Sequence, residues 1–212
     1  MACPMFTSGT TEWPPIAPDG VVSVPLPPEH GAPGSLVGNV LVVDRESLVT
    51  PAFIVRGDHL PILASLAASQ TSALEPPHAM VWGVDLGAAS SRRAAHKQLR
   101  LACRDVLGVA TAHETLAHLF VVYTHGAALL EGTCLTAAGQ VAAKLHAELE
   151  RARGRFVEVI LIDATGWEDE VALRDRIVQT VATPAGVAGD VALGWHSLTD
   201  ASIHQAAMEQ LC

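Results

Sequence analysis

Two apolar segments of the chain each end in a short polar turn whose residues could carry out chemistry. HLFVVYTHGA ends at His125 and Gly126, and FVEVILIDATGW ends at Asp163, Thr165 and Gly166. Histidine is the commonest general base in proteins, and a nearby carboxylate can assist it. Ligands and catalytic groups collect at the C-terminal ends of strands in open α/β sheets. The two turns therefore form the best candidate site in the sequence.

Three further residues could contribute to such a site. Cys134 stands near the start of a predicted helix, where the backbone dipole can acidify a thiol, so it is the best candidate for a catalytic thiol. Asp85 and His196 stand at the ends of two other predicted strands and are candidate ligand-binding residues, together with the two turn glycines, Gly126 and Gly166.

Each of these residues also has a structural interpretation. The ring of His125 could bond to a neighbouring backbone group, and Asp163 could cap the turn and helix that follow it. Cys134 could simply be buried as a small apolar residue. The sequence leaves both interpretations open.

The two turns resemble the caspase-like fold of cysteine peptidases over residues 79–166. A strand that ends in His-Gly, then a helix, then an apolar strand that ends in Asp-Ala-X-X-Gly is similar to the pattern of that family. The resemblance implies that His125 is the general base and that the residue after Asp163-Ala164 is the nucleophile. At that position the chain has Thr165 instead of cysteine. A threonine hydroxyl needs a strong adjacent base, so we expect a domain without peptidase activity.

Other motif-based chemistries are not supported. His113 and His118 flank a glutamate, but a zinc-protease helix needs its histidines at i and i+4, and these are at i and i+5. The chain has no Gly-x-Ser-x-Gly elbow, no Gly-x-Gly-x-x-Gly and no Gly-Lys-Ser/Thr. We therefore predict neither a metal site nor a cofactor.

The pattern of apolar runs predicts an α/β fold with a mostly parallel, doubly wound sheet and helices on both faces. A Pro-rich extended arm (1–35) is predicted to precede a single α/β domain (36–212), in which a hairpin-like segment (35–57) comes before the alternating strands and helices. Strands and helices are predicted to alternate over 61–74 (helix), 78–85, 90–107 (helix), 115–123 (leading into His125-Gly126), 136–153 (helix), 156–163, 168–181 (helix), 190–196 and 200–210 (helix). Gly108 and Gly154 are predicted to stop two of the helices.

Composition narrows the class of partner. The net charge of the 212-residue chain is −9, which argues against binding to nucleic-acid phosphates. The one basic run, from Arg92 to Arg104, is interpreted as a solvated helix face, with contact to an anion as the alternative. No apolar run is long enough for a membrane span, and no signal peptide is visible, so we expect a soluble cytoplasmic protein without membrane contact.

The sequence favours a non-catalytic binding or assembly subunit, because it has no complete nucleophile set and carries an arm that cannot form its own core. The Pro-rich arm is expected to contact its own domain or a partner, and a protein partner or a homo-oligomer is expected. The alternative is a hydrolase that uses His125 and Asp163 with Thr165 or Cys134 as the nucleophile. A ligand sensor with the same edge loops is a third possibility.

Overall fold

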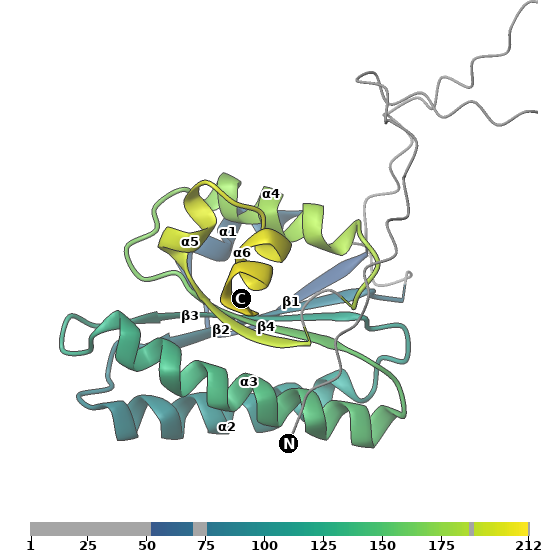
Figure 1. Cartoon of the computed structure of the whole chain (residues 1–212), viewed down its shortest axis with the longest axis horizontal. Helices are drawn as coiled ribbons and strands as arrows, with labels where there is room; N and C mark the ends of the chain where they lie inside the picture. Colours follow the sequence, from purple (N-terminus) through teal and green to yellow (C-terminus); the bar gives the residue numbers. More distant parts are fainter. Residues whose placement is uncertain (1–51, 70–75, 187–188, 212) are drawn as a thin grey trace, which may run out of the picture. The chain divides into compact units, whose positions relative to one another are not determined.

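Five parallel strands form one sheet in the part of the chain that the structure describes (Figure 1). The structure is a computed structural model that describes residues 52–69, 76–186 and 189–211. The strand order is the order in sequence, β1-β2-β3-β4-β5, and the bounds are β1 Phe53–Gly57, β2 Ala79–Leu86, β3 His118–His125, β4 Glu158–Asp163 and β5 Asp190–Gly194. The parallel α/β class is confirmed. The predicted arm and the first strand of the predicted hairpin lie outside the described residues.

Helices cover both faces of the sheet, as Figure 1 shows. On one face lie α2 (Arg92–Ala110) and α3 (Glu131–Arg153). On the other lie the 3-10 turn Pro61–Leu63, α1 (Ala64–Ala68), α4 (Glu170–Val181), α5 (Trp195–Thr199) and α6 (Ile203–Leu211). Each strand lies next to the one before it in sequence, and the chain always moves across the sheet in the same direction. A crossover that passes over one face therefore has the opposite handedness to a crossover that passes over the other face. The crossovers through α2 and α3 thus share one handedness, and those through α1 and α4 have the opposite one. One pair is therefore left-handed, which is rare in parallel sheets.

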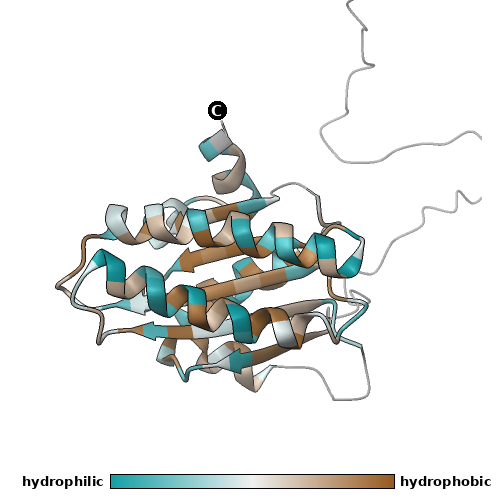
Figure 2. Cartoon of the chain, turned by 90° about the horizontal axis from the view of Figure 1, so that it is seen from below, coloured by the Kyte–Doolittle hydropathy of each residue, from teal (hydrophilic) through white to brown (hydrophobic). Residues whose placement is uncertain are grey.

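The strands are almost continuously apolar because both of their faces are covered. In β3 and β4, alternate residues enter two separate cores. Leu119, Val121 and Tyr123 pack under α2 and α3, whereas Phe120 and Val122 pack under α1 and α4. Figure 2 shows the apolar strands beneath helices whose outer residues are hydrophilic. In the described residues, no helix is both long and apolar enough to cross a membrane.

The register of the sheet places the predicted polar turns at one edge. Leu86 pairs with His125, Tyr123 pairs with Asp163, and Asp163 pairs with Gly194. The ends of β2, β3, β4 and β5 are therefore level with one another, as expected for parallel strands.

Two helix boundaries on the α2–α3 face differ from the prediction. Gly108 does not stop α2, which continues to Ala110 because the burial of Val106 and Ala110 outweighs the helix propensity of one glycine. The helix predicted to begin at residue 136 begins at Glu131 instead. The predicted stop at Gly154 is confirmed, and its φ of +66° is the left-handed conformation that ends many helices.

The last predicted strand is shorter than expected. β5 ends at Gly194, and Trp195 begins the short helix α5 instead of continuing the strand to residue 196. The physical reason lies in the burial pattern, since Leu198 is buried one helical turn after Trp195. His196 therefore lies on a helix beside the sheet edge and not on a strand end.

Candidate functional site

The turn after β4 is built around the carboxylate of Asp163. Its Oδ1 accepts a hydrogen bond from the backbone N–H of Thr165 at 3.0 Å. The N–H of Ala164 donates to the carbonyl of Tyr123 on β3 at 2.9 Å. Gly166 follows with a φ of +83°, a conformation that side chains disfavour. Asp163 thus holds the turn that follows it, as the sequence allowed, whereas the following helix α4 is capped by Asp169, whose carboxylate accepts a hydrogen bond from the N–H of Ala172.

Thr165 joins this turn to the turn after β3. Its Oγ1 accepts a hydrogen bond from the backbone N–H of His125 at 2.8 Å. The hydroxyl is therefore bonded to the main chain of His125 and not to its ring. A general base must reach the proton of the nucleophile, so this contact does not make a nucleophile–base pair.

The ring of His125 is oriented by its own turn. Its Nδ1 lies 3.0 Å from the carbonyl oxygen of Gly126. Because a carbonyl oxygen only accepts, Nδ1 carries the proton in this contact. In the neutral ring, the lone pair is then on Nε2, which lies 3.2 Å from Oδ2 of Asp163. The backbone contact that the sequence allowed for His125 is present.

Cys134 joins this pair from the first turns of α3. One ligand atom from each of His125, Cys134 and Asp163 lies within 4.8 Å of the others. Cys134 is 1% exposed and Asp163 is fully buried. Burial first, and then the charge of Asp163, raise the pKa of the Cys134 thiol to about 11. The expected acidification by the helix dipole is therefore wrong, because burial and a neighbouring carboxylate outweigh it.

Several polar atoms of this cluster make no hydrogen bond of standard geometry. Four buried side-chain atoms of the described residues lack one, and three of them lie here, namely the Tyr123 hydroxyl, Nε2 of His125 and Oδ2 of Asp163. The contact between His125 and Asp163 is short but not aligned as a hydrogen bond. Burial, followed by the charges of Asp163 and Cys134 and a hydrogen-bonding interaction with the Asp163 carboxylate, raises the pKa of Tyr123. We call His125, Cys134, Asp163 and Tyr123 the buried cluster.

The remaining predicted site residues lie outside the buried cluster. Asp85 is exposed, and its carboxylate accepts a hydrogen bond from the N–H of Gly87 at 2.7 Å. Gly126 lies against this loop, since a Cβ on it would come within 3.1 Å of the Gly87 carbonyl oxygen. The His196 side chain is 63% exposed, and its Nε2 lies 3.9 Å from Glu131. Neither Asp85 nor His196 hydrogen-bonds to the buried cluster.

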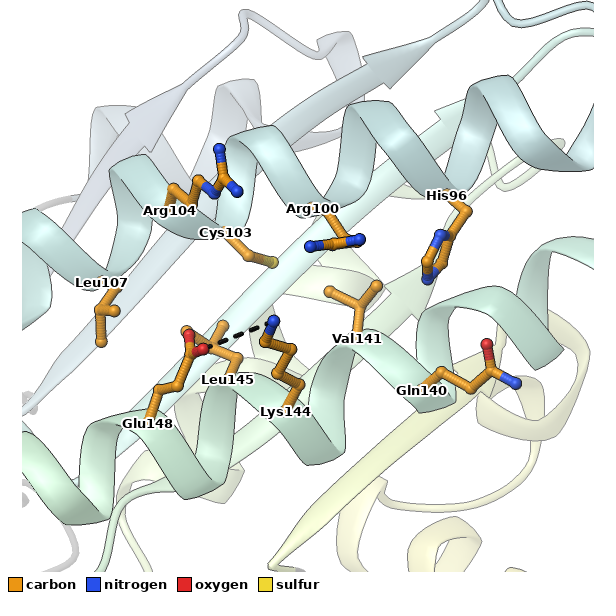
Figure 3. Close-up of a pocket in the computed structure, with 10 residues that line it drawn as sticks. All are labelled: His96, Arg100, Cys103, Arg104, Leu107, Gln140, Val141, Lys144, Leu145 and Glu148. Carbon is orange, nitrogen blue, oxygen red and sulfur yellow. Dashed lines mark ion pairs between the residues drawn. The ribbon is translucent and has the colours of Figure 1, made fainter.

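A second feature is a groove of about 410 Å³ between α2 and α3, which we call the α2–α3 groove. Figure 3 shows its lining from α2 and α3, which consists of His96, Arg100, Cys103, Arg104, Leu107, Gln140, Val141, Lys144, Leu145 and Glu148. The floor is apolar and the rim is mainly basic. Lys144 is 3.7 Å from Glu148, an exposed i,i+4 pair that salt screens readily.

The guanidinium groups on the rim are not neutralised by the rest of the domain. Arg100 and Arg104 are exposed, and neither has a hydrogen-bond or ion-pair partner among residues 52–69, 76–186 and 189–211. A second hollow lies along the outer side of α2, and Arg93, Lys97 and Leu101 line it together with these two arginines. The basic run of the sequence is thus a solvated helix face, as predicted, and it also borders two hollows.

A polar network that was not predicted from the sequence lies at the opposite end of the strands, where β3 and β4 begin. Glu158 at the start of β4 is fully buried, and its Oε2 lies 2.9 Å from His118 and 3.2 Å from His204. These residues come from β3, β4 and α6, so no spacing of residues in the sequence predicts the network. A glutamate inside an otherwise apolar strand was the one available signal, because buried carboxylates are normally paired.

Comparisons with known proteins do not assign the chain to a family. No protein-family model, no curated protein and no solved structure matches it. The caspase-like resemblance stays a prediction from two short motifs. The function is therefore inferred from the geometry of the buried cluster and the α2–α3 groove.

Proposed function

We propose that this protein is a non-catalytic binding domain whose α2–α3 groove binds an acidic segment of a partner protein. The observation that carries the proposal is the pair of exposed, unpartnered arginines, Arg100 and Arg104, above an apolar floor. The chain as a whole has a net charge of −9, so this concentration of positive charge runs against the overall sign. Opposite potentials across an interface steer association and suppress wrong partners.

Charge and apolarity together favour a protein segment as the occupant. Leu101 is 47% exposed beside the arginines, and Val141 and Leu145 lie under the groove. An acidic segment with apolar side chains satisfies both features. A nucleic acid would bring a continuous row of phosphates, and the acidic remainder of this chain would repel it. Arginine is also the cation that pairs best with carboxylates, through two parallel hydrogen bonds.

A second candidate function is a thiol hydrolase at the buried cluster. The proximity of Cys134, His125 and Asp163 favours it, since a thiol, a base and a carboxylate are the parts of such a site. Two observations oppose it. The pKa of Cys134 is raised to about 11, so the thiol stays protonated near neutral pH, and the side chain is 1% exposed. In addition, the Thr165 hydroxyl is bonded to the backbone of His125.

Fluorescence anisotropy tests the binding proposal. The probes are a labelled peptide of alternating glutamate and leucine and its glutamine counterpart. The variant Arg100→Glu/Arg104→Glu reverses the charge of the groove. The matched control Arg151→Glu/Arg155→Glu makes the same change in net charge at two exposed arginines that do not line it. We expect the acidic peptide to bind the wild type and the control, and the groove variant to bind it about 10- to 100-fold more weakly, since each exposed pair is worth up to about 1 kcal/mol and each reversal also adds repulsion.

Three outcomes would overturn the proposal: equal binding of both peptides, an equal loss of affinity in both variants, or tighter binding of a single-stranded DNA probe than of the acidic peptide. The hydrolase candidate has its own test. A thiol-directed activity probe should label the native protein at Cys134, and His125→Ala should abolish the labelling. Labelling that requires unfolding removes the hydrolase candidate and leaves the binding proposal intact.

A further inference from the structure

We propose that Sγ of Cys134, Nε2 of His125 and Oδ2 of Asp163 bind a divalent zinc-class metal ion. One ligand atom from each of these residues, which come from α3, β3 and β4, lies within 4.8 Å of the others, and Nε2 of His125 lies 3.2 Å from Oδ2 of Asp163. The site lies in the interior beneath the start of α3, apart from the α2–α3 groove. The sequence motifs predicted no metal site.

The orientation of His125 is the first argument. Its Nδ1–H donates to the Gly126 carbonyl oxygen at 3.0 Å, which places the lone pair of the neutral ring on Nε2. Metal-binding histidines show this arrangement, in which the second ring nitrogen donates to a backbone carbonyl or a carboxylate. The His125 side chain is 6% exposed, and its Nε2 has no hydrogen-bond partner.

The carboxylate of Asp163 shows the complementary arrangement. Its Oδ1 is held by the N–H of Thr165 at 3.0 Å, while Oδ2 is buried and accepts no hydrogen bond of standard geometry. The Tyr123 hydroxyl is the neighbouring group that interacts with this carboxylate. Oδ2 lies 3.2 Å from Nε2 of His125. When the ring is neutral and the carboxylate is charged, two lone pairs face each other at this distance. A cation between them removes the repulsion and gives each of the two atoms a partner. Buried polar atoms in folded proteins normally have such a partner.

The third donor selects the class of metal. A thiolate, an imidazole and a carboxylate are together typical ligands of zinc, whereas magnesium and calcium prefer oxygen ligands alone. Binding releases the Cys134 proton to solvent, because the thiolate is the ligand. The ion, one thiolate and one carboxylate then sum to zero net charge, which suits a buried site. The hydroxyl of Tyr123 is the remaining polar atom of the buried cluster.

The burial of the cluster favours a structural role, and the fourth position of a tetrahedral ion would be taken by a water molecule or by the Tyr123 hydroxyl. Cys134 and Asp163 are at most 1% exposed, so a substrate has no path to the ion in this conformation. The ion would fasten the first turns of α3 to the ends of the two central strands. The separations of 9 residues between His125 and Cys134 and of 29 residues between Cys134 and Asp163 match no common zinc motif, so the spacing does not predict the site.

The test uses the untagged full chain with the metal ions alone. After incubation with Zn²⁺ and removal of excess metal, mass spectrometry of the metal content should give one zinc per chain. The Co²⁺ form should show a thiolate-to-metal charge-transfer absorption band. Cys134→Ser should remove this band and weaken Zn²⁺ binding by about 100-fold or more. The matched control Cys103→Ser changes the other described buried cysteine, which lies on α2, and should bind Zn²⁺ like the wild type.

Two outcomes overturn the inference. One is a wild-type chain that retains no zinc or gives a Co²⁺ spectrum without a thiolate band. This outcome is measured on the wild type alone, so it does not depend on whether any variant folds. The other is equal zinc retention in the wild type, in Cys134→Ser and in Asp163→Asn. Asp163→Asn keeps the shape of the side chain and covers the case in which Cys134→Ser does not fold.

Discussion

The hydrogen bond between Thr165 and the backbone of His125 makes a sharp prediction about stability. Thr165→Val keeps the shape of the side chain and removes the oxygen that accepts the His125 N–H at 2.8 Å. The contact is partly buried, so water replaces the lost partner incompletely. A buried donor left without a partner costs about 1–3 kcal/mol, and partial access to water places this one at the lower end, about 1–2 kcal/mol. For a chain of this size, that loss lowers Tm by roughly 2–8 °C.

Urea unfolding followed by circular dichroism measures the effect, with Thr165→Ser as the matched control. Serine keeps the acceptor oxygen and loses only a methyl group from a half-buried position. We therefore expect Thr165→Ser to lose less than half of the stability that Thr165→Val loses. If valine is as stable as threonine, or if serine destabilises as much as valine, the hydroxyl does not hold the two turns together.

Three further predictions concern other parts of the domain. Burial, and then the charge of Glu148, raise the pKa of Cys103 from 9.0 to about 12. The folded state therefore disfavours the thiolate more than the unfolded state does. The free energy of unfolding should consequently fall as pH rises from about 9 to about 12. Under reducing conditions, this loss should reach roughly 1.4 kcal/mol at about pH 10, and urea unfolding of Cys103→Ala should show a correspondingly smaller fall. Glu158→Gln removes the buried charge that faces His118 and His204 and should lower the free energy of unfolding by about 1–3 kcal/mol. The control Glu148→Gln, at a half-exposed position, should change the free energy of unfolding by less than about 0.5 kcal/mol. Gly166→Ala forces a φ of +83° on a side chain and should lower stability by about 1–2 kcal/mol in thermal unfolding, and an unchanged Tm would show that the turn relaxes.

Much of the fold could be predicted from the sequence because its apolar runs and turn residues agree with the tertiary structure. A helix was expected to begin at residue 90 or 91, and α2 begins directly after Ser91, whose side chain accepts a hydrogen bond from the N–H of Ala94. Gly154 was expected to end α3 and does so. His125 and Asp163 were expected at neighbouring strand ends. They lie on the adjacent parallel strands β3 and β4, and Nε2 of His125 is 3.2 Å from Oδ2 of Asp163. In each case, a local pattern and the packing of the sheet require the same conformation.

The remaining features depend on tertiary contacts that no local pattern encodes. α2 passes through Gly108 because its buried face continues beyond that glycine. The raised pKa of Cys134 depends first on its burial under the packed helix α3, and then on the charge of Asp163, which is 29 residues away in the sequence. Tyr123 was overlooked as a polar group, although its spacing of two residues from His125 places both side chains on the same face of β3.

A charge swap at the α2–α3 groove tests the proposed function most directly. The measurement compares the affinities of a glutamate–leucine peptide and a lysine–leucine peptide for the wild type and for Arg100→Glu/Arg104→Glu. If the groove binds an acidic protein segment, the wild type prefers the acidic peptide and the variant prefers the basic peptide. An unchanged preference in the variant, with its fold intact by circular dichroism, would contradict the proposal.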